Sequence, residues 1–487
     1  MRKHLLFYAV VLCVFGAGIV GILEIGLRLQ PDAALVGQQS ATTSRLSTPP
    51  QPVKASSSTF GRVPYKNLQH PLSILLLQVI VIISAARGIG QLFRKMGQPA
   101  VIGEMIAGIL LGPSCLGMLS PGAQAFVFPA ASLDTLQLLS QIGIILFMFV
   151  VGIELDVQHL RQRAQAAVLV SHASIVVPFF LGVACSLFLY HTLAPAPITF
   201  RAFALFMGIA MSITAFPVLA RILEERGLST SSLGSTAIAC AAVDDVTAWC
   251  LLAVVVAIVQ ADGLSGALLT IGLTLLFIGF MLFLLRPQVC RLLGPEVWSE
   301  TRSKGLTAGV LTLVFAAALC TEVIGIHALF GAFLTGVSMP SHTRLRIFLR
   351  ERLETLSAVL LLPLFFAFTG LRTQIGLLND WQSWAMCAGI IAVAISGKWG
   401  GSVLAARWTG LSWPDALAIG VLMNTRGLME LVVLNIGYDL GILSPHIFAM
   451  MVLMALATTF MTGPLLALLE WGKRRGTFRI PEAGVAV

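Results

Sequence analysis

Charged residues are scarce in this chain of 487 amino acids, since Asp, Glu, Lys and Arg together make up only 11%, against roughly 25% in a typical soluble domain. Hydrophobic residues make up 57%, and the mean hydropathy is +0.91. A soluble fold cannot bury that much apolar surface, because a single core stops growing at about 250–300 residues. The apolar residues form long runs separated by short polar breaks, which indicates an all-α polytopic membrane protein and not a β-barrel.

Several motifs are absent as well. The sequence has no Walker A motif, which argues against nucleotide-driven pumping, and no His-Glu-x-x-His or Gly-x-Ser-x-Gly motif, which argues against an intramembrane enzyme. Its eight cysteines form no Cys-x-x-Cys pair, so neither a zinc site nor a disulfide framework is indicated. The net charge of +9 comes from clusters between apolar runs, as membrane orientation requires, and does not indicate nucleic acid binding. No enzyme activity and no cofactor are expected.

The composition divides the chain into four segments. Residues 1–29 predict a signal-anchor helix or a signal peptide, and an uncleaved helix is favoured because the apolar run exceeds the roughly 7–15 residues of a signal h-region. Residues 30–70 are rich in Ser, Thr, Pro and Gln and predict a flexible linker. Residues 71–470 form the membrane domain, and residues 471–487 form a short tail.

The membrane domain contains about thirteen apolar runs, each near the roughly 20 residues that a bilayer crossing needs. They lie at residues 71–92, 99–119, 134–153, 165–190, 199–222, 232–259, 263–285, 305–323, 325–339, 356–372, 382–405, 414–437 and 446–470. The run at 325–339 is short, which predicts a broken or tilted helix.

Basic residues cluster at alternate ends of these runs, which orients the chain by the positive-inside rule. The loops near 120–133, 191–198, 260–262 and 438–445 contain no Lys or Arg. The pattern predicts a multi-pass protein of the cell membrane, here a bacterial inner membrane, surrounded by lipid and with a cytoplasmic C-terminus. The basic clusters that share the cytoplasmic side are Arg94-Lys95, Arg161/Arg163, Arg221/Arg226, Arg286/Arg291/Arg302/Lys304, Arg344/Arg346/Arg350/Arg352, Arg407 and Lys473/Arg474/Arg475.

Two adjacent acids, Asp244 and Asp245, lie in the middle of one run and give the strongest functional signal. An ionisable residue at the centre of a membrane helix costs about 2.5–3.5 kcal/mol on insertion scales, so it needs a partner or an aqueous cavity. Adjacent helical residues point about 100° apart, so one acid can pair with a buried cation while the other faces water. A carboxyl in that position can exchange protons, and its ionised form is an oxygen ligand for an alkali cation. The alternative is a hydrogen-bonded pair that only joins helices.

Lys398 is also in the middle of a run, and one of the two aspartates is its natural partner; a lysine that snorkels to the surface is the alternative. Thr214 and Pro217 lie mid-run, where proline frees backbone carbonyls. Freed carbonyls near the midplane are frequent ion ligands in transporters, although a plain proline kink would give the same sequence.

The segment Asn424–Glu430 predicts a second break, where Arg426 and Glu430 are spaced to form an ion pair on one helix face. That pair is at least as well explained by holding the break as by substrate contact. Paired interruptions in the two halves indicate an inverted repeat with the transport site between them. Weaker candidates, which lie toward span ends, are Glu104, Glu154, Asp156, Glu322 and His327.

Taken together, these stretches resemble the monovalent cation:proton antiporter-2 family, which includes sodium/proton antiporters, Kef-type potassium transporters and plant cation/proton exchangers. The resemblance covers about residues 71–470. The matching stretches are Gln98–Glu104 through Gly112-Pro113, Gly152–Asp156, Thr214–Arg221, Asp244-Asp245, Gly397-Lys398 and Asn424–Gly437. The N-terminal 70 residues lie outside the family pattern, and the nucleotide-binding domain of Kef-type members has no counterpart in this sequence.

The resemblance implies a fold of thirteen helices with a dimerisation domain, a six-helix core and two unwound helices that cross near the midplane. It implies electrogenic exchange of Na⁺ or K⁺ for H⁺ by an elevator-like homodimer, with Asp245 as the shared cation and proton site and Asp244 paired with Lys398. Thr214 and Asn424 would lie at the crossing. A cation channel and a non-transporting cation sensor are the alternative functions, although no filter-like repeat supports a channel.

Overall fold

The computed structural model describes residues 2–28, 70–154, 164–196, 198–229, 231–260, 264–292, 303–340 and 343–474, and every regular element in these ranges is a helix. The predicted linker lies outside the described residues, apart from His70 at its end, and so does the tail beyond Arg474. Large apolar side chains such as Phe188, Leu276 and Phe283 remain exposed on the helix surfaces. Helices that are apolar on all sides are typical of membrane spans, so the all-α membrane fold predicted from the sequence is confirmed.

One group of helices, which we name the core bundle, packs around α10 and α20. Polar N-caps begin three of its helices: Thr199, Asp380 and Ser412 each accept a hydrogen bond from a backbone amide of the first turn. The members are α10 (Ala164–Leu193), α11 (Phe200–Ser212), α12 (Phe216–Glu225), α13 (Ser232–Gln260), α20 (Trp381–Trp408), α21 (Trp413–Met423), α22 (Leu428–Asp439) and α23 (Pro445–Arg474).

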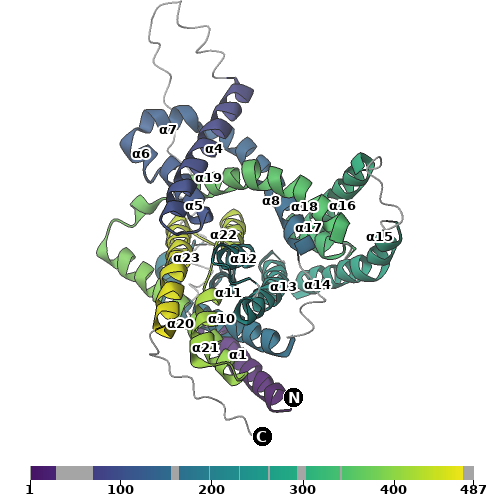
Figure 1. Ribbon diagram of the computed structural model, residues 1–487. Coiled ribbons are helices and arrows are strands. Elements are labelled where there is room, and N and C mark those ends of the chain that lie inside the picture. The colour runs from purple at the N-terminus through teal and green to yellow at the C-terminus, as the bar shows by residue number, and fades with distance from the viewer. Residues whose placement is uncertain are drawn as a thin grey trace, which may run out of the picture.

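A second group, the flanking bundle, packs through α5 against α19 and through α8 against α17 (Figure 1). Its members are α4 (Pro71–Lys95), α5 (Ala100–Leu111), α8 (Ala130–Glu154), α16 (Ser303–Ile324), α17 (Ala328–Val337), α18 (Thr343–Leu356) and α19 (Leu362–Arg372). A π-helical turn, Ser357–Leu361, joins α18 to α19. Along the chain, α13 of the core bundle is followed by α14 (Leu264–Gly279), η2 (Phe280–Leu285) and α15 (Arg286–Leu292), which lead to α16 of the flanking bundle. Two short helices, α6 (Leu116–Leu119) and α7 (Pro121–Val127), precede α8.

The number of spans differs from the sequence prediction in detail. Each of the thirteen predicted regions contains helix, but eleven helices in the described ranges are long and apolar enough to cross a membrane, or twelve when the bent pair α21 and α22 counts as one. The run predicted at 325–339 forms only the ten residues of α17, because Gly325 and His327 both have positive φ angles and interrupt the helix before it. A count of thirteen full spans is therefore not confirmed.

The core bundle contains two matching triplets of spans, with the middle span interrupted in each. Here α11 and α12 are separated by Ile213–Ala215, while α21 and α22 are separated by Asn424–Gly427 and bent by 41°. The first helices of the two triplets, α10 and α20, are antiparallel, since Gly397 packs against Pro178 while Gly401 packs against Ala173. This arrangement is the one that an inverted repeat requires.

Glycines bring neighbouring helices into backbone contact within each bundle. A Cβ atom added to Gly336 of α17 would lie 2.2 Å from the carbonyl oxygen of Phe149 in α8. One added to Gly108 of α5 would lie 2.2 Å from the carbonyl oxygen of Phe366 in α19. Among the glycines that the structure describes, the contacts under 3.0 Å between these helices all join members of the same bundle. Small residues thus fix the packing inside the bundles and not between them.

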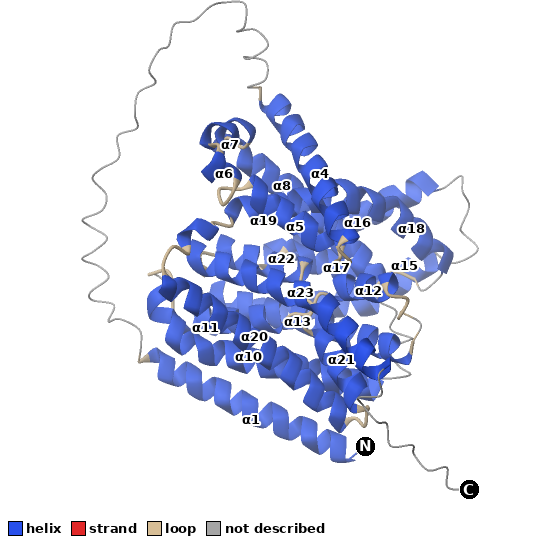
Figure 2. Cartoon of the chain, turned by 60° about the vertical axis from the view of Figure 1, so that its left-hand side comes forward, coloured by secondary structure: helices blue, strands red, loops and turns tan. Residues whose placement is uncertain are grey.

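The N-terminal segment forms α1 (Arg2–Leu27), which lies along the core bundle beside α10 (Figure 2). Phe15 of α1 stacks edge-on against Phe180 of α10, with 5.2 Å between the ring centroids. Gly18 and Gly26 face the rings of Phe180 and Phe200 so closely that a Cβ atom at either position would require the ring to shift. The helix predicted for residues 1–29 is therefore present, and whether it is a retained anchor stays a prediction.

Candidate functional site

The two helix breaks of the core bundle are bonded directly to each other. The amide of Ala215 donates a hydrogen bond to the carbonyl oxygen of Thr425 over 3.0 Å, and the Thr214 hydroxyl donates to the carbonyl oxygen of Met423 over 3.0 Å. Pro217 occupies the first turn of α12, where its missing amide hydrogen leaves no helical bond unmade. The sequence therefore stops and restarts both helices at one crossing point.

The open end of α11 is closed by one side chain from α20 and one from the break between α21 and α22. Its last carbonyl groups carry the partial negative charge of a helix C-terminus and lack intrahelical donors. Arg426 donates to the carbonyl oxygens of Ala210 and Met211 over 2.9 and 2.6 Å, and Lys398 donates to that of Ser212. Both cations are completely buried. They therefore stabilise the helix break itself.

Asp244 is a fully bonded, buried carboxylate. Its Oδ1 accepts a hydrogen bond from Ser174 over 2.8 Å, and its Oδ2 accepts from the Thr214 amide over 2.9 Å and from Lys398 over 3.1 Å. Neither Asp244 nor Lys398 exposes any side-chain surface. The pair of Asp244 and Lys398, which the family resemblance implies, is thus brought together, and it holds α10, α11, α13 and α20 around the break.

Asp245 has the opposite environment, although it is the next residue of α13. Its side chain is buried, yet neither carboxyl oxygen makes a hydrogen bond with any residue that the structure describes. The backbone amide of Phe216, at the start of α12, faces this carboxyl without meeting hydrogen-bond geometry. An isolated buried carboxylate costs several kcal/mol. Of the two acids, only Asp245 lacks a hydrogen-bond partner among the described residues.

The break between α21 and α22 has its own set of partners. Arg426 and Glu430 form a completely buried ion pair of 2.9 Å, as their spacing predicts. The hydroxyl of Thr459 accepts a hydrogen bond from the Arg426 amide and donates one to the Arg426 carbonyl oxygen. Asn424 is also buried, and its side-chain oxygen has no hydrogen-bond donor among the described residues. These contacts make Arg426 and Glu430 supports of the break, while the oxygen of Asn424 is free to take a ligand.

Two contributors to this site, Ser174 and Thr459, were not identified from the sequence. Both are hydroxyl residues inside long apolar helices, and such residues usually bond to their own helix. Nothing in the local pattern distinguishes Ser174 from the neighbouring Ser171, whose side-chain oxygen has no hydrogen-bond partner in the described part of the chain. Only the position of Asp244 on the adjacent helix shows that Ser174, and not Ser171, belongs to the site.

A cavity of about 390 Å³ leads toward the crossing from the arginine-rich side, and we name it the arginine-side cavity. It lies between the bundles and reaches Pro217 in the first turn of α12 and Leu428, the first residue of α22. Its charged lining residues include Glu104 and Glu154, which the sequence places near span ends. Glu154 forms an ion pair of 3.1 Å with Arg350. The full set of charged residues in the lining is Arg87, Glu104, Glu154, Arg221, Glu224, Arg350 and Glu354.

A buried carboxyl at the crossing of two interrupted helices, with a cavity lined by charged residues that leads toward the crossing from one side, is typical of secondary transporters. Comparison with known proteins agrees. A family model described as the transmembrane sodium/hydrogen exchanger matches residues 79–470. The chain therefore belongs to the sodium/hydrogen exchanger family, and its resemblance to monovalent cation:proton antiporters is confirmed.

Individual relatives support this assignment. The chain is 46% identical over 395 residues to the Na⁺/H⁺ antiporter NhaS4 of Synechocystis, covering 81% of this chain and 96% of that protein. It is 42% identical to cation/H⁺ antiporter 17 of Arabidopsis thaliana, covering 88% of this chain and 52% of that protein. For K⁺/H⁺ antiporter 1 of Saccharomyces cerevisiae the identity is 35%, covering 82% of this chain and 46% of that protein. The chain thus spans about half the length of the plant and yeast relatives.

A solved structure shares the fold at much lower sequence identity. The sodium/proton antiporter MjNhaP1 of Methanocaldococcus jannaschii superimposes with a TM-score of 0.60 at 14% identity, covering 84% of this chain and 99% of that one. The agreement is one of architecture, and it places the crossed helices of this chain in a known antiporter fold.

Proposed function

We propose that this protein exchanges a monovalent cation, Na⁺ or K⁺, for protons across the membrane, and that both ions compete for Asp245. The observation that carries the proposal is the contrast between two adjacent carboxyl groups. Asp244 makes three hydrogen bonds, whereas Asp245 makes none with the described residues. The names of the relatives support cation/proton exchange but do not identify the ion-binding residue.

The charges of the site favour alternation between two neutral states. Lys398 balances Asp244, and Arg426 balances Glu430, so among the described residues at the crossing Asp245 is the acid without a counter-ion. A proton or a monovalent cation bound to Asp245 neutralises it. Because moving a bare charge through a low-dielectric region is costly, the loaded protein changes conformation more easily than the empty one. The carboxyl cannot hold a proton and a cation at the same oxygen, so each ion displaces the other.

Neutral oxygens at the crossing can complete the coordination of the cation. Asn424 has a free side-chain oxygen, and the Thr214 hydroxyl keeps its lone pairs because it acts as a donor to Met423. Among the described residues no group of three or more His, Cys, Asp or Glu side chains is arranged around a metal ion. The proposed site is therefore one carboxylate with neutral oxygens, a set suited to a singly charged cation.

Further features of the proposal follow the family resemblance. The arginine-rich side is assigned to the cytoplasm by the positive-inside rule, which makes the C-terminus cytoplasmic. We extend the proposal to a homodimer in a bacterial inner membrane and to electrogenic exchange, in which more protons than cations move per cycle. A transport current that follows an imposed voltage in proteoliposomes tests the electrogenicity.

The central experiment measures cation-induced collapse of a pH gradient in everted membrane vesicles. Asp245→Asn should abolish the response to Na⁺ and K⁺, because an amide neither releases a proton nor balances a cation. Asp245→Glu keeps the carboxyl and should retain exchange with an altered half-saturating concentration. Asp134→Asn, at an exposed acid far along the chain from the crossing, serves as the control. Full exchange by a correctly inserted Asp245→Asn protein would refute the role of Asp245.

Two further measurements separate exchange from the two alternative functions. A channel would show unitary conductance in a planar bilayer, and a sensor would bind cation without isotope uptake. Alternating access is supported by a second, separate cavity, lined by Gln137, Gln141 and Asp439, which lies at the other end of α22 from the arginine-side cavity.

A further inference from the structure

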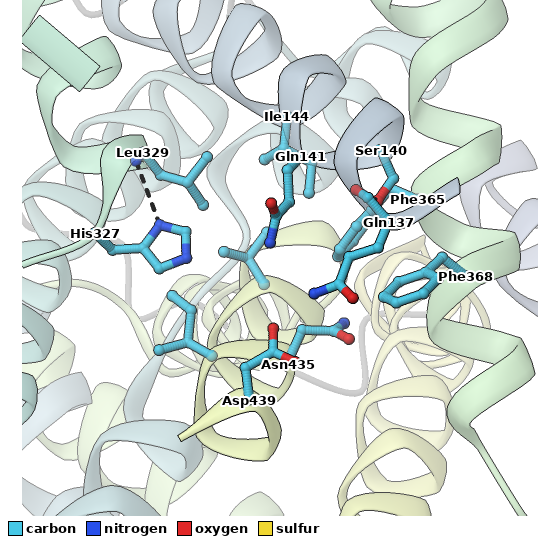
Figure 3. Close-up of a pocket in the computed structure, with 12 residues that line it drawn as sticks. Gln137, Ser140, Gln141, Ile144, His327, Leu329, Phe365, Phe368, Asn435 and Asp439 are labelled. Atoms are coloured by element: carbon cyan, nitrogen blue, oxygen red, sulfur yellow. Dashed lines mark hydrogen bonds between the residues drawn. The ribbon is translucent and has the colours of Figure 1, made fainter. Parts of the chain in front are cut away.

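A second, smaller cavity lies between the bundles on the side opposite the arginine-side cavity, and we name it the glutamine pocket (Figure 3). Its volume is about 30 Å³, enough for one or two particles of the size of a water molecule. The side chains of Gln137 and Gln141 from α8 and of Asp439 from α22 point into the same space, and the ring of His327 lies at its edge. The pocket therefore offers amide and carboxylate oxygens to a small ligand.

The two glutamines have no assigned partners. The side-chain amides of Gln137 and Gln141 form no hydrogen bond with another residue in the described ranges, although both residues are partly buried. A partly buried amide normally satisfies its oxygen and its amino group, because an unmade hydrogen bond is costly. Their oxygens are therefore available to a bound water molecule or cation.

Arg372, at the end of α19, contacts two of the polar residues that line this pocket. It forms an ion pair of 2.7 Å with Asp439 and donates a hydrogen bond of 3.1 Å to the side-chain oxygen of Asn435. Its guanidinium group also lies 4.2 Å from the ring centroid of Phe368 and 5.1 Å from that of Tyr438. Because α19 belongs to the flanking bundle and α22 to the core bundle, this side chain ties the bundles together beside the pocket, as does a 2.8 Å hydrogen bond from the Asn435 amide to the Thr369 hydroxyl.

The same three helices line both cavities at successive levels. Along α22, Leu428 lines the arginine-side cavity, and Asn435 and Asp439 line the glutamine pocket. Along α19, Phe366 lines the arginine-side cavity, and the neighbouring Phe365 lines the glutamine pocket. Helix α8 likewise contributes residues to both cavities. The two cavities are thus opposite ends of one seam between the bundles, separated by a layer of mainly apolar side chains.

We infer that the glutamine pocket is the entry site for the transported monovalent cation from the side opposite the arginine-side cavity, with Asp439 as its charged ligand. The amide oxygens of Gln137 and Gln141 supply neutral ligands. In the conformation described here, the guanidinium of Arg372 takes the place of the cation on Asp439 and holds the seam closed. Displacement of Arg372 by an arriving cation frees the bundles to separate at this end. The inference deepens the proposed antiport function and rests on it.

A purely structural role for Arg372 and Asp439 predicts different behaviour. A simple clasp would affect folding or turnover equally for ions that arrive from either side. An entry site changes the apparent cation affinity on one side only. The half-saturating cation concentration measured separately from each side is therefore the deciding quantity.

The experiment compares everted and right-side-out vesicles that contain the full-length protein, with Na⁺ and K⁺ as the probes. Asp439→Asn should raise the half-saturating concentration about fivefold for cations on the pocket side, as expected for the loss of one partly exposed charge, and leave the other side unchanged. Arg372→Gln removes the competing cation and should lower that concentration on the same side. Asp134→Asn, an exposed acid in the first turns of the same helix as Gln137, is the matched control.

The outcomes separate this inference from the proposed function. Equal changes on both sides, or none on either, for both Asp439→Asn and Arg372→Gln would overturn the entry site while leaving antiport intact. If Asp439→Asn fails to insert, Arg372→Gln decides alone. An entry site predicts a lower half-saturating cation concentration on the pocket side only, whereas a structural clasp predicts the same effect on both sides. Absence of exchange in the unmodified protein from both sides would instead refute the proposed function.

Discussion

The buried pair of Lys398 and Asp244 allows a quantitative test of how the site is held together. Lys398→Met removes the counter-ion of Asp244 and the donor to the Ser212 carbonyl oxygen, but it keeps most of the side-chain volume. Breaking a buried ion pair by deleting one partner costs about 3–5 kcal/mol, because the remaining charge is left uncompensated. Asp244→Asn leaves Lys398 in the same position and should cost a similar amount.

The double variant, Asp244→Asn with Lys398→Met, leaves no buried charge behind. Replacing a buried pair by neutral groups of similar volume is often close to neutral in stability, so the double change should cost less than either single change, instead of the roughly 6–10 kcal/mol expected from additivity. The amide side chain introduced by Asp244→Asn can still accept the hydrogen bond from the Thr214 amide with its oxygen, while its amino group faces the Ser174 hydroxyl, which can act as an acceptor.

The free energy of unfolding of the purified protein, titrated with a denaturing detergent, measures all three variants. Arg407→Met, at a basic residue outside the crossing on the same helix as Lys398, is the control for general loss of charge. Additive costs in the double variant would show that the two residues do not depend on each other, and the account of the pair as the support of the α11 break would be wrong.

Two further predictions concern the packing around the site. Ser174→Ala should lower the free energy of unfolding by about 1.5–3 kcal/mol, the value of a hydrogen bond to a charged group; an unchanged stability in the same titration would mean that Asp244 does not need this donor. Gly336→Ala should sharply reduce the yield of folded protein, because its Cβ would lie 2.2 Å from the Phe149 carbonyl oxygen, whereas Gly389→Ala meets nothing within 4 Å. Size-exclusion profiles of the two glycine variants in detergent compare them directly, and equal profiles would contradict the close approach of α8 and α17.

The sequence reveals much of the site because charge is so rare in the apolar runs. Asp244, Lys398, Arg426 and Glu430 each stand out against their surroundings, and a membrane interior forces such residues to find partners. Because so few charges are available in the apolar runs, the sequence leaves few possible ion pairs among these residues. Which of the two aspartates stays unpaired does not follow, because it depends on the rotation of α13 relative to Ser174 and the Thr214 amide.

Other features were not available from the sequence for physical reasons. Hydroxyl residues such as Ser174 and Thr459 carry no distinctive pattern, since most of their kind bond within their own helix. Arg372 lies at a span end, where basic residues are common, and only its contacts with α22 show that it bridges two bundles. The shortness of α17 depends on local backbone conformations at Gly325 and His327 that hydropathy does not report.

The restriction of tight glycine contacts to helices of the same bundle has a mechanical consequence. Where backbones touch, any sliding must break many close contacts at once, so each bundle resists internal shear. Along the seam, larger side chains and empty volume separate the two bodies, and displacement there exchanges one set of side-chain contacts for another. The fold therefore has one preferred plane of slip, and a small apolar molecule wedged into that plane would arrest the motion without touching Asp245.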